Sequence, residues 1–235
     1  MHGWRSRIGL IVPSSNTTME SELWSSLPDG VSLHTARVPL TDVNAWSLER
    51  MEEHSKGAAG SLMDAEVDCI LFGCTSGSLI KGAEHNLSMS QEMEDMLGVP
   101  FVTTSTAVVE ALRSLDMKEI AVVTPYIDEV NEKEKRFLED NGFEVLSVRG
   151  MGLERNREIG ERTAEESYRF ARENFVRSDG LFVSCTNLRT FGVIDMLERD
   201  LGTNVVTSNQ ASLWLALERA GVRERIEGLG RLLAP

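Results

Sequence analysis

The sequence repeats itself once, and this repeat constrains the fold more than any single motif does. Three segments of the first half recur in the second half in the same order, at offsets of 112, 111 and 104 residues. The matched pairs are residues 9–13 (GLIVP) with 121–125 (AVVTP), 68–75 (DCILFGCT) with 179–186 (DGLFVSCT), and 102–107 (VTTSTA) with 206–211 (VTSNQA). Each matched segment lies at the end of a strand-like apolar run, so the repeat predicts two similar lobes.

Apolar runs typical of strands alternate with longer amphipathic stretches along the chain. The strand-like runs are residues 8–12, 31–38, 67–72, 101–102, 120–124, 144–148, 180–184 and 205–206, and helical patterns cover residues 48–63, 130–140, 165–175 and 212–220. This alternation predicts an α/β fold in which each lobe is a parallel sheet flanked by helices. We expect lobes at residues 1–115 and 116–207, with a C-terminal helix in 208–235 packing back on the first. A ligand site is expected between them, at the carboxyl ends of the strands.

Composition excludes several classes of protein. A net charge of −13 argues against nucleic-acid binding, which needs clustered basic residues. No apolar run reaches the roughly 20 residues that cross a bilayer, and the short run ending at Pro13 is too brief for a signal peptide. We therefore expect a cytoplasmic protein with no membrane partner. The three cysteines form no CxxC pair and the four histidines show no metal-ligand spacing, so neither a disulfide framework nor a metal site is expected.

Two cysteines, Cys74 and Cys185, occupy equivalent positions of the repeat, each directly after an apolar strand. A polar turn that opens a helix follows Cys74. Backbone N–H groups and the helix dipole at such a position favour a thiolate, so we expect a low pKa for Cys74. Either cysteine alone could be a buried apolar residue, but two at equivalent strand ends indicate catalysis. Cys69 has no counterpart, since its match is Gly180, and it is predicted to lie in the core.

Other strand ends carry polar side chains. Ser14 and Asn16 follow the first strand, where hydroxyl, amide and N–H donors suit a carboxylate, although helix capping produces the same pattern. Tyr126 follows the matching strand, and its hydroxyl could donate to a substrate or remain in water. Asn209 and Gln210 fit helix capping better than ligand contact. The charge run at residues 129–135 predicts a solvated helix face.

These segments resemble the aspartate/glutamate racemase superfamily, and within it the maleate cis–trans isomerase and arylmalonate decarboxylase branch. The resemblance spans nearly the whole chain and is carried by residues 9–20, 73–77, 124–126, 184–187 and 207–211. Decarboxylases of this branch have glycine in place of the first cysteine, so the presence of both cysteines disfavours decarboxylation. Maleate isomerases add an N-terminal Asn, a Tyr after the fifth strand and an Asn in the following loop. These features fall on Asn16, Tyr126 and Asn156.

The resemblance implies a cofactor-independent isomerase that converts maleate, or a related cis-alkene diacid, to fumarate. Cys74 would form a covalent adduct with the alkene, and Cys185 would act as acid and base on the opposite side. The side chains expected to bind the small dicarboxylate are Asn16, Tyr126, Asn156, Ser14, Thr75, Ser76 and Thr186. We also expect a homo-oligomer.

Two other functions stay open. An amino-acid racemase or epimerase would use the same cysteines as opposed bases and would need an acid, such as Glu20 or Asp128, for the ammonium group. A non-catalytic protein that binds small dicarboxylates is the other, and it predicts thiols of ordinary reactivity.

Overall fold

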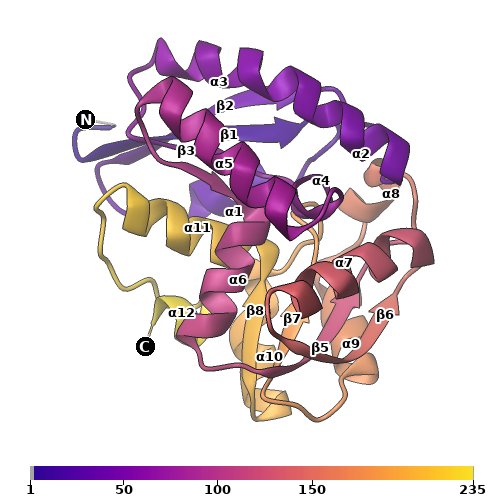
Figure 1. The fold of residues 1–235 in the computed structure, drawn as a ribbon. Helices are drawn as coiled ribbons and strands as arrows, with labels where there is room; N and C mark the ends of the chain where they lie inside the picture. Colours follow the sequence, from indigo (N-terminus) through magenta and orange to yellow (C-terminus); the bar gives the residue numbers. More distant parts are fainter. Residues whose placement is uncertain (1–2, 235) are drawn as a thin grey trace.

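A computed structural model describes residues 3–234 and contains two four-stranded parallel sheets, one from each half of the repeat (Figure 1). The strand order is β2-β1-β3-β4 in the first sheet and β6-β5-β7-β8 in the second. Each strand therefore occupies the same place in its sheet as its repeat partner does in the other. The predicted α/β fold with two similar lobes is confirmed.

The eight predicted strands are all present, with ends within two residues of those expected. They are β1 (Ser6–Pro13), β2 (Val31–Val38), β3 (Cys69–Phe72), β4 (Phe101–Thr103), β5 (Glu119–Thr124), β6 (Glu144–Gly150), β7 (Gly180–Val183) and β8 (Asn204–Thr207). The short central strands β3 and β7 are buried along their whole length, as expected of parallel strands covered on both faces.

The helices are α1 (Met19–Ser25), α2 (Ala45–Met51), α3 (Ser55–Met63), α4 (Thr75–Leu79), α5 (Ala83–Leu97), α6 (Thr104–Ser114), α7 (Asp128–Asp140), α8 (Asn156–Gly160), α9 (Ala164–Asn174), α10 (Ile194–Leu201), α11 (Ser208–Arg219) and α12 (Gly230–Leu233). The single helix predicted at 48–63 is wrong, because the 3₁₀ turn Glu52–His54 interrupts it between α2 and α3. The Ser55 hydroxyl donates back to the Met51 carbonyl (3.4 Å), a contact that tends to bend helices.

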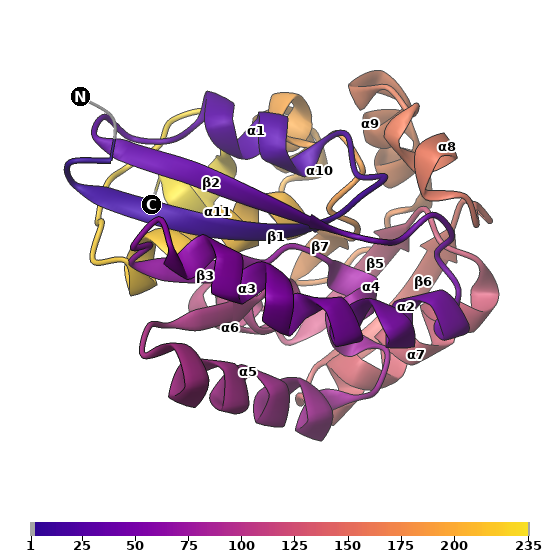
Figure 2. The same cartoon turned by 90° about the horizontal axis from the view of Figure 1, so that it is seen from above.

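Helices cover both faces of the first sheet, with α1 and α11 on one face and α3 and α5 on the other (Figure 2). Helices α6 and α11 lie side by side between the two sheets (Figure 1). Helix α6 follows β4 yet contacts β8, and α11 follows β8 yet contacts β3 and β4. Because both helices touch both sheets, the lobe boundaries at 115 and 207 stay a prediction. The predicted outer limits at residues 1 and 235 lie outside the described residues.

Helix α11 begins with a capping box. The Thr207 hydroxyl accepts the N–H of Gln210 (3.2 Å), and the Gln210 side chain accepts the N–H of Thr207 (3.0 Å). Two N–H groups that a helix start leaves unpaired are thereby satisfied. The capping interpretation of this segment is confirmed for Gln210, while the N-cap itself is Thr207.

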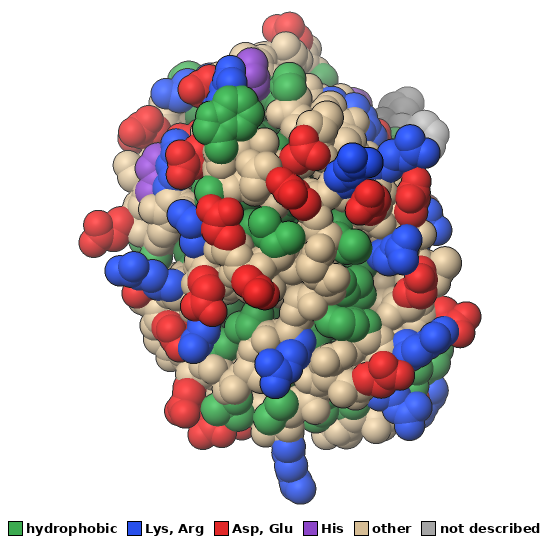
Figure 3. Space-filling model, turned by 90° about the vertical axis from the view of Figure 1, so that its right-hand side faces the viewer, with side chains coloured by type: hydrophobic (Ala, Val, Ile, Leu, Met, Phe, Trp, Pro, Cys, Tyr) green, Lys and Arg blue, Asp and Glu red, His purple; other side chains and the backbone are tan. Residues whose placement is uncertain are grey.

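On the face of the molecule seen in Figure 3, acidic and basic side chains are interspersed, so this face carries no large patch of one charge. Among residues 3–234, no helix has the length and apolar character that a membrane span requires.

Candidate active site

The carboxyl ends of the four central strands bring together residues from both halves of the repeat. Asn16 follows β1, Cys74 follows β3, Tyr126 follows β5 and Cys185 follows β7. All four side chains are buried, with exposed fractions of 1% to 5%. Both thiols lie near enough to the Tyr126 side chain to raise the pKa of its hydroxyl electrostatically. These residues form one buried cluster that neither half supplies alone.

Cys74 is the N-cap residue of the five-residue helix α4. Its Sγ accepts the N–H of Gly77 at 3.3 Å and lies 3.8 Å from the Ser76 hydroxyl. A side chain at Gly77 would crowd this contact, since a Cβ there would lie 2.9 Å from the sulfur.

The expected low pKa of Cys74 is wrong. Burial is the largest influence and raises the pKa of the Cys74 thiol to about 11, although the contacts with Gly77 and Ser76 lower it. Helix α4 has five residues and donates one N–H to the sulfur. This contact does not offset the free-energy cost of removing a thiolate from water. In this structure Cys74 is therefore a thiol at neutral pH.

Cys185 repeats the position of Cys74 but not its conformation. Its φ is +99°, which side-chain-bearing residues rarely adopt, and a turn rather than a helix follows it. Its Sγ accepts the N–H of Asn187 at 3.4 Å, and its own N–H donates to the Ser208 hydroxyl at 2.9 Å. Burial raises the pKa of Cys185 to about 12, which the bond from Tyr126 offsets only in part. Cys69 lies buried within β3, as predicted.

The backbone at Cys185 gives a stability prediction. We expect Cys185→Gly to be more stable than Cys185→Ala by up to about 1 kcal/mol, because glycine adopts this φ without steric strain. This figure already allows for the larger chain entropy that glycine loses on folding. Urea unfolding of the two variants measures the difference, and neither carries a thiol at this position. An alanine variant of equal or greater stability would show that the position is not strained.

Asn16 joins the two halves through its side-chain amide. Its Nδ2 donates to the Thr186 hydroxyl at 3.1 Å, while its Oδ1 accepts the N–H groups of Thr18 and Met19. Thr186 in turn donates to the carbonyl of Gly73, next to Cys74 (3.2 Å). The amide of Asn16 is thus held in one orientation beside both cysteine-bearing turns.

Asn156, the first residue of α8, is also buried and contacts this group of residues. Its Nδ2 donates to the Ser15 hydroxyl at 2.8 Å, and its Oδ1 accepts from Nδ2 of Asn187 at 3.1 Å. Asn187 also accepts the N–H of Thr17 through Oδ1 (2.8 Å). Sequence reasoning did not assign Asn187 a role, although its place two residues after Cys185 was a usable signal.

A second residue missed from the sequence is Ser208, whose hydroxyl is fully buried. It accepts from the Thr75 hydroxyl at 2.8 Å and from the N–H of Cys185 at 2.9 Å. Ser208 therefore connects the two cysteine-bearing turns. This contact was not predicted from the sequence, because the start of this helix was interpreted as capping.

Not every predicted binding residue lies in the cluster. Thr75, Ser76 and Thr186 are buried there, but Ser14 is exposed. Its hydroxyl accepts the N–H of Leu40 at 3.2 Å, so it anchors the loop after β2 instead of facing the thiols.

Neither acid that was expected to hold an ammonium group is buried with the cluster. Glu20 pairs with Arg37 at 2.8 Å, and Asp128 is exposed. Glu134 was assigned to a solvated face, and that interpretation is wrong, because its side chain is fully buried near Cys185. No group of three or more His, Cys, Asp or Glu side chains within residues 3–234 is placed to hold a metal ion.

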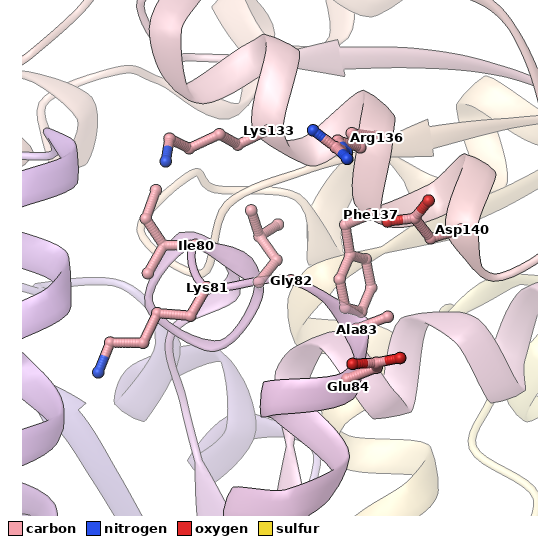
Figure 4. A pocket seen from close by; sticks show the side chains of 10 residues that line it. Ile80, Lys81, Gly82, Ala83, Glu84, Lys133, Arg136, Phe137 and Asp140 are labelled. Carbon is pink, nitrogen blue, oxygen red and sulfur yellow. The ribbon is translucent and has the colours of Figure 1, made fainter.

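The cluster is closed in this structure. The loop after β2 reaches the loop before α8, where Val43 donates its N–H to the carbonyl of Glu154 (2.7 Å) and Asn156 donates to that of Thr41 (3.0 Å). A cavity of about 570 Å³ lies elsewhere, between the α4–α5 connection and α7 (Figure 4), and neither cysteine lines it. Both thiols are largely screened from solvent in this structure.

Comparison with known proteins places these features in context. The family model described as arylmalonate decarboxylase matches residues 8–233. A maleate isomerase of Nocardia farcinica (strain IFM 10152) is 31% identical over 97% of this chain and 95% of its own. An arylmalonate decarboxylase of Bordetella bronchiseptica is 35% identical over 96% of this chain and 95% of its own.

A solved structure adds a chemical detail. It is a cysteine-to-serine mutant of the Nocardia farcinica maleate cis-trans isomerase with a covalently bound succinylcysteine intermediate. It superimposes on this chain with a TM-score of 0.91 at 27% identity, covering 97% of this chain and 98% of its own.

Proposed function

The chain belongs to the arylmalonate decarboxylase family, and we propose that it is a cofactor-independent isomerase that converts maleate, or a related cis-alkene diacid, to fumarate. One observation carries the proposal: two buried thiols, Cys74 and Cys185, follow equivalent strands of the two sheets, and Cys74 is near enough to raise the pKa of Cys185. A pair of this kind can add to one alkene carbon and protonate the other.

The proposed reaction begins with addition of the Cys74 sulfur to one alkene carbon. The π electrons move toward the neighbouring carboxylate, and the Cys185 thiol gives its proton to the adjacent carbon. The proton lost by Cys74 ends on Cys185, so the adduct is a succinyl thioether and the charges balance. Rotation about the new single bond and reversal of the same steps release the trans diacid. The succinylcysteine seen in the related isomerase is the species that these reaction steps would form.

Neutral hydrogen-bond donors suit this chemistry. Asn16, Tyr126 and Asn156 would bind the carboxylates together with Thr75, Ser76 and Thr186. Neutral donors can stabilise the negative charge that develops during addition without permanently lowering the proton affinity of Cys185. Ser14 would support the covering loop instead of the substrate.

Two competing reactions use the same site. Decarboxylation is favoured by the 35% identity to the Bordetella enzyme, but Cys74 would have no role in it if one thiol protonates the product. Racemisation would use both thiols, but neither acid expected to bind the ammonium group is buried with them, since Glu20 pairs with Arg37 and Asp128 is exposed. Homo-oligomerisation and a cytoplasmic location stay predictions.

Proton NMR of the purified protein tests the proposal. With maleate we expect its alkene signal to be replaced by that of fumarate. Phenylmalonate and the enantiomers of aspartate and glutamate, in deuterated buffer, serve as parallel samples. Loss of carbon dioxide from phenylmalonate without fumarate formation would identify a decarboxylase. Deuterium at an amino-acid α-carbon would identify a racemase.

A further inference from the structure

Glu134 occupies a position where an apolar side chain would be expected. The buried face of α7 carries Val130, Glu134, Phe137 and Leu138, which follow helical spacing, and Glu134 is fully buried among them. Its Oε1 accepts one hydrogen bond, from the Ser184 hydroxyl at 2.5 Å, and its Oε2 has no partner. A buried carboxyl group with one partner is costly, and such groups are concentrated at functional sites.

The residue that corresponds to Glu134 in the first half of the repeat has a structural role. Glu22 on α1 stands 112 residues earlier, the same offset that relates β1 to β5. Its carboxylate accepts the N–H groups of Thr190 (2.7 Å) and Phe191 (3.0 Å) and the side-chain amide of Asn209 (2.6 Å). Glu22 is thus fully engaged in holding the loop after β7.

The donors that would serve Glu134 are used elsewhere. At the offset of the cysteines, Thr190 and Phe191 correspond to Leu79 and Ile80. Leu79 is the last residue of α4, and Ile80 donates its N–H to Ser76 within the same helical run. Ser105, which corresponds to Asn209, directs its hydroxyl to Ser78 and to the carbonyl of Thr75. Formation of α4, the helix that Cys74 caps, therefore leaves Glu134 without these partners.

Solvent does not replace them. The void beside Glu134 has no space for a water molecule, and Leu79 and Phe137 line both this void and the open cleft of Figure 4. Lys133 and Arg136, on the same helix, line that cleft and do not face the void. Burial accordingly raises the pKa of Glu134 to about 8.

A charge on Glu134 changes the pKa values of Cys185 and Tyr126, which lie on one side of the site. A negative Glu134 raises the pKa of Cys185 and of Tyr126, whereas the pKa of Cys74 is set by burial and by its contacts with Gly77 and Ser76. Other charged residues near α7, Glu144 and Arg149 of β6, are exposed. Glu134 therefore adds a charge difference to the conformational difference between the two thiols.

We propose that Glu134 is a positioning residue: hydrogen-bonded to Ser184, the residue before Cys185, it places an acid on the Cys185 side of the site and so favours Cys185 as the proton donor and Cys74 as the nucleophile. This inference rests on the proposed function for the meaning of the two roles. The effect on the thiols themselves is measurable without substrate.

The test compares iodoacetamide labelling of the two cysteines from pH 7 to 10, located by peptide mass spectrometry, in the wild-type protein and in Glu134→Gln. We expect the variant to label Cys185 about tenfold faster at pH 9–10, because a missing neighbouring charge lowers a thiol pKa by about one unit. Labelling of Cys74 should change far less. Glu22→Gln, the repeat counterpart, is the matched control and should leave the ratio of Cys185 to Cys74 labelling unchanged.

A second variant and a second measurement keep the test decisive. Ser184→Ala removes the one donor to Glu134, so Glu134 should ionise at higher pH and the suppression of Cys185 labelling should begin later. Because the folded pKa of Glu134 lies above its unfolded value, its contribution to stability is present below about pH 4.5 and lost as the pH rises through about 8. Glu134→Gln should remove that loss in thermal unfolding.

The outcomes separate the two proposals. An altered stability profile with an unchanged labelling ratio in both variants would overturn the positioning role. An altered ratio in a wild-type background that makes no fumarate would support the positioning role and contradict the isomerase.

Discussion

The variant Cys74→Ala is expected to lose isomerisation by roughly a thousandfold or more, because without the sulfur no covalent bond can convert the alkene into a rotatable single bond. The rate is measured by proton NMR with saturating maleate. The fold should persist, since the side chain is small and buried and its one strong contact, the N–H of Gly77, belongs to a short helix turn.

The matched control for this variant is Cys69→Ala. Cys69 lies in β3, five residues before Cys74, and is buried to the same extent without any contact to the cluster of site residues. It should keep wild-type activity with a small loss of stability. Appreciable fumarate formation by Cys74→Ala, with Cys69→Ala equally active, would remove Cys74 from the nucleophile role.

Most of the fold could be predicted because its signals are local and occur twice. Each strand is an apolar run that can be found without knowing its neighbours, and the repeat fixes how the runs correspond. The positions of Cys74, Cys185 and Tyr126 followed from the same logic, since the carboxyl ends of parallel strands meet at one edge. The exception in the first lobe is the interrupted helix at 48–63, where a side-chain contact of Ser55 changes the path.

The parts of the site that could not be predicted depend on which polar groups tertiary packing buries. In the sequence, Ser208 and Asn187 are residue types common in helix caps and turns. Only the approach of the two lobes brings their side chains into contact with both halves of the site. The predicted direction of the Cys74 pKa shift was wrong for the same reason. Burial raises this pKa more than the hydrogen-bond donors of the five-residue helix lower it. Glu134 was hidden in a charge run, although its spacing from Val130 and Phe137 places it on the apolar face of α7.

The variant Cys185→Ser is expected to accumulate a covalent adduct on Cys74. If Cys185 supplies and recovers the proton of the adjacent carbon, replacing its thiol with a far weaker acid slows the collapse of the adduct more than its formation. Intact mass spectrometry after incubation with maleate should show one added maleic acid per chain, located to the peptide that contains Cys74. The related isomerase, in which a cysteine-to-serine mutant holds succinylcysteine, shows that such a species can persist in this fold.

Maleate also alkylates thiols slowly without catalysis, so selectivity decides the result. Cys69 in the same sample reports the uncatalysed rate at a buried thiol, and the double variant Cys74→Ala/Cys185→Ser should show no adduct beyond slow labelling of Cys69. A parallel incubation with fumarate should reach the same adduct from the other isomer, because both alkenes share one succinyl intermediate. A racemase or decarboxylase removes or delivers a proton without bonding sulfur to carbon. Unmodified Cys74 after prolonged incubation with both diacids would therefore exclude the covalent route and leave proton transfer as the work of the two thiols.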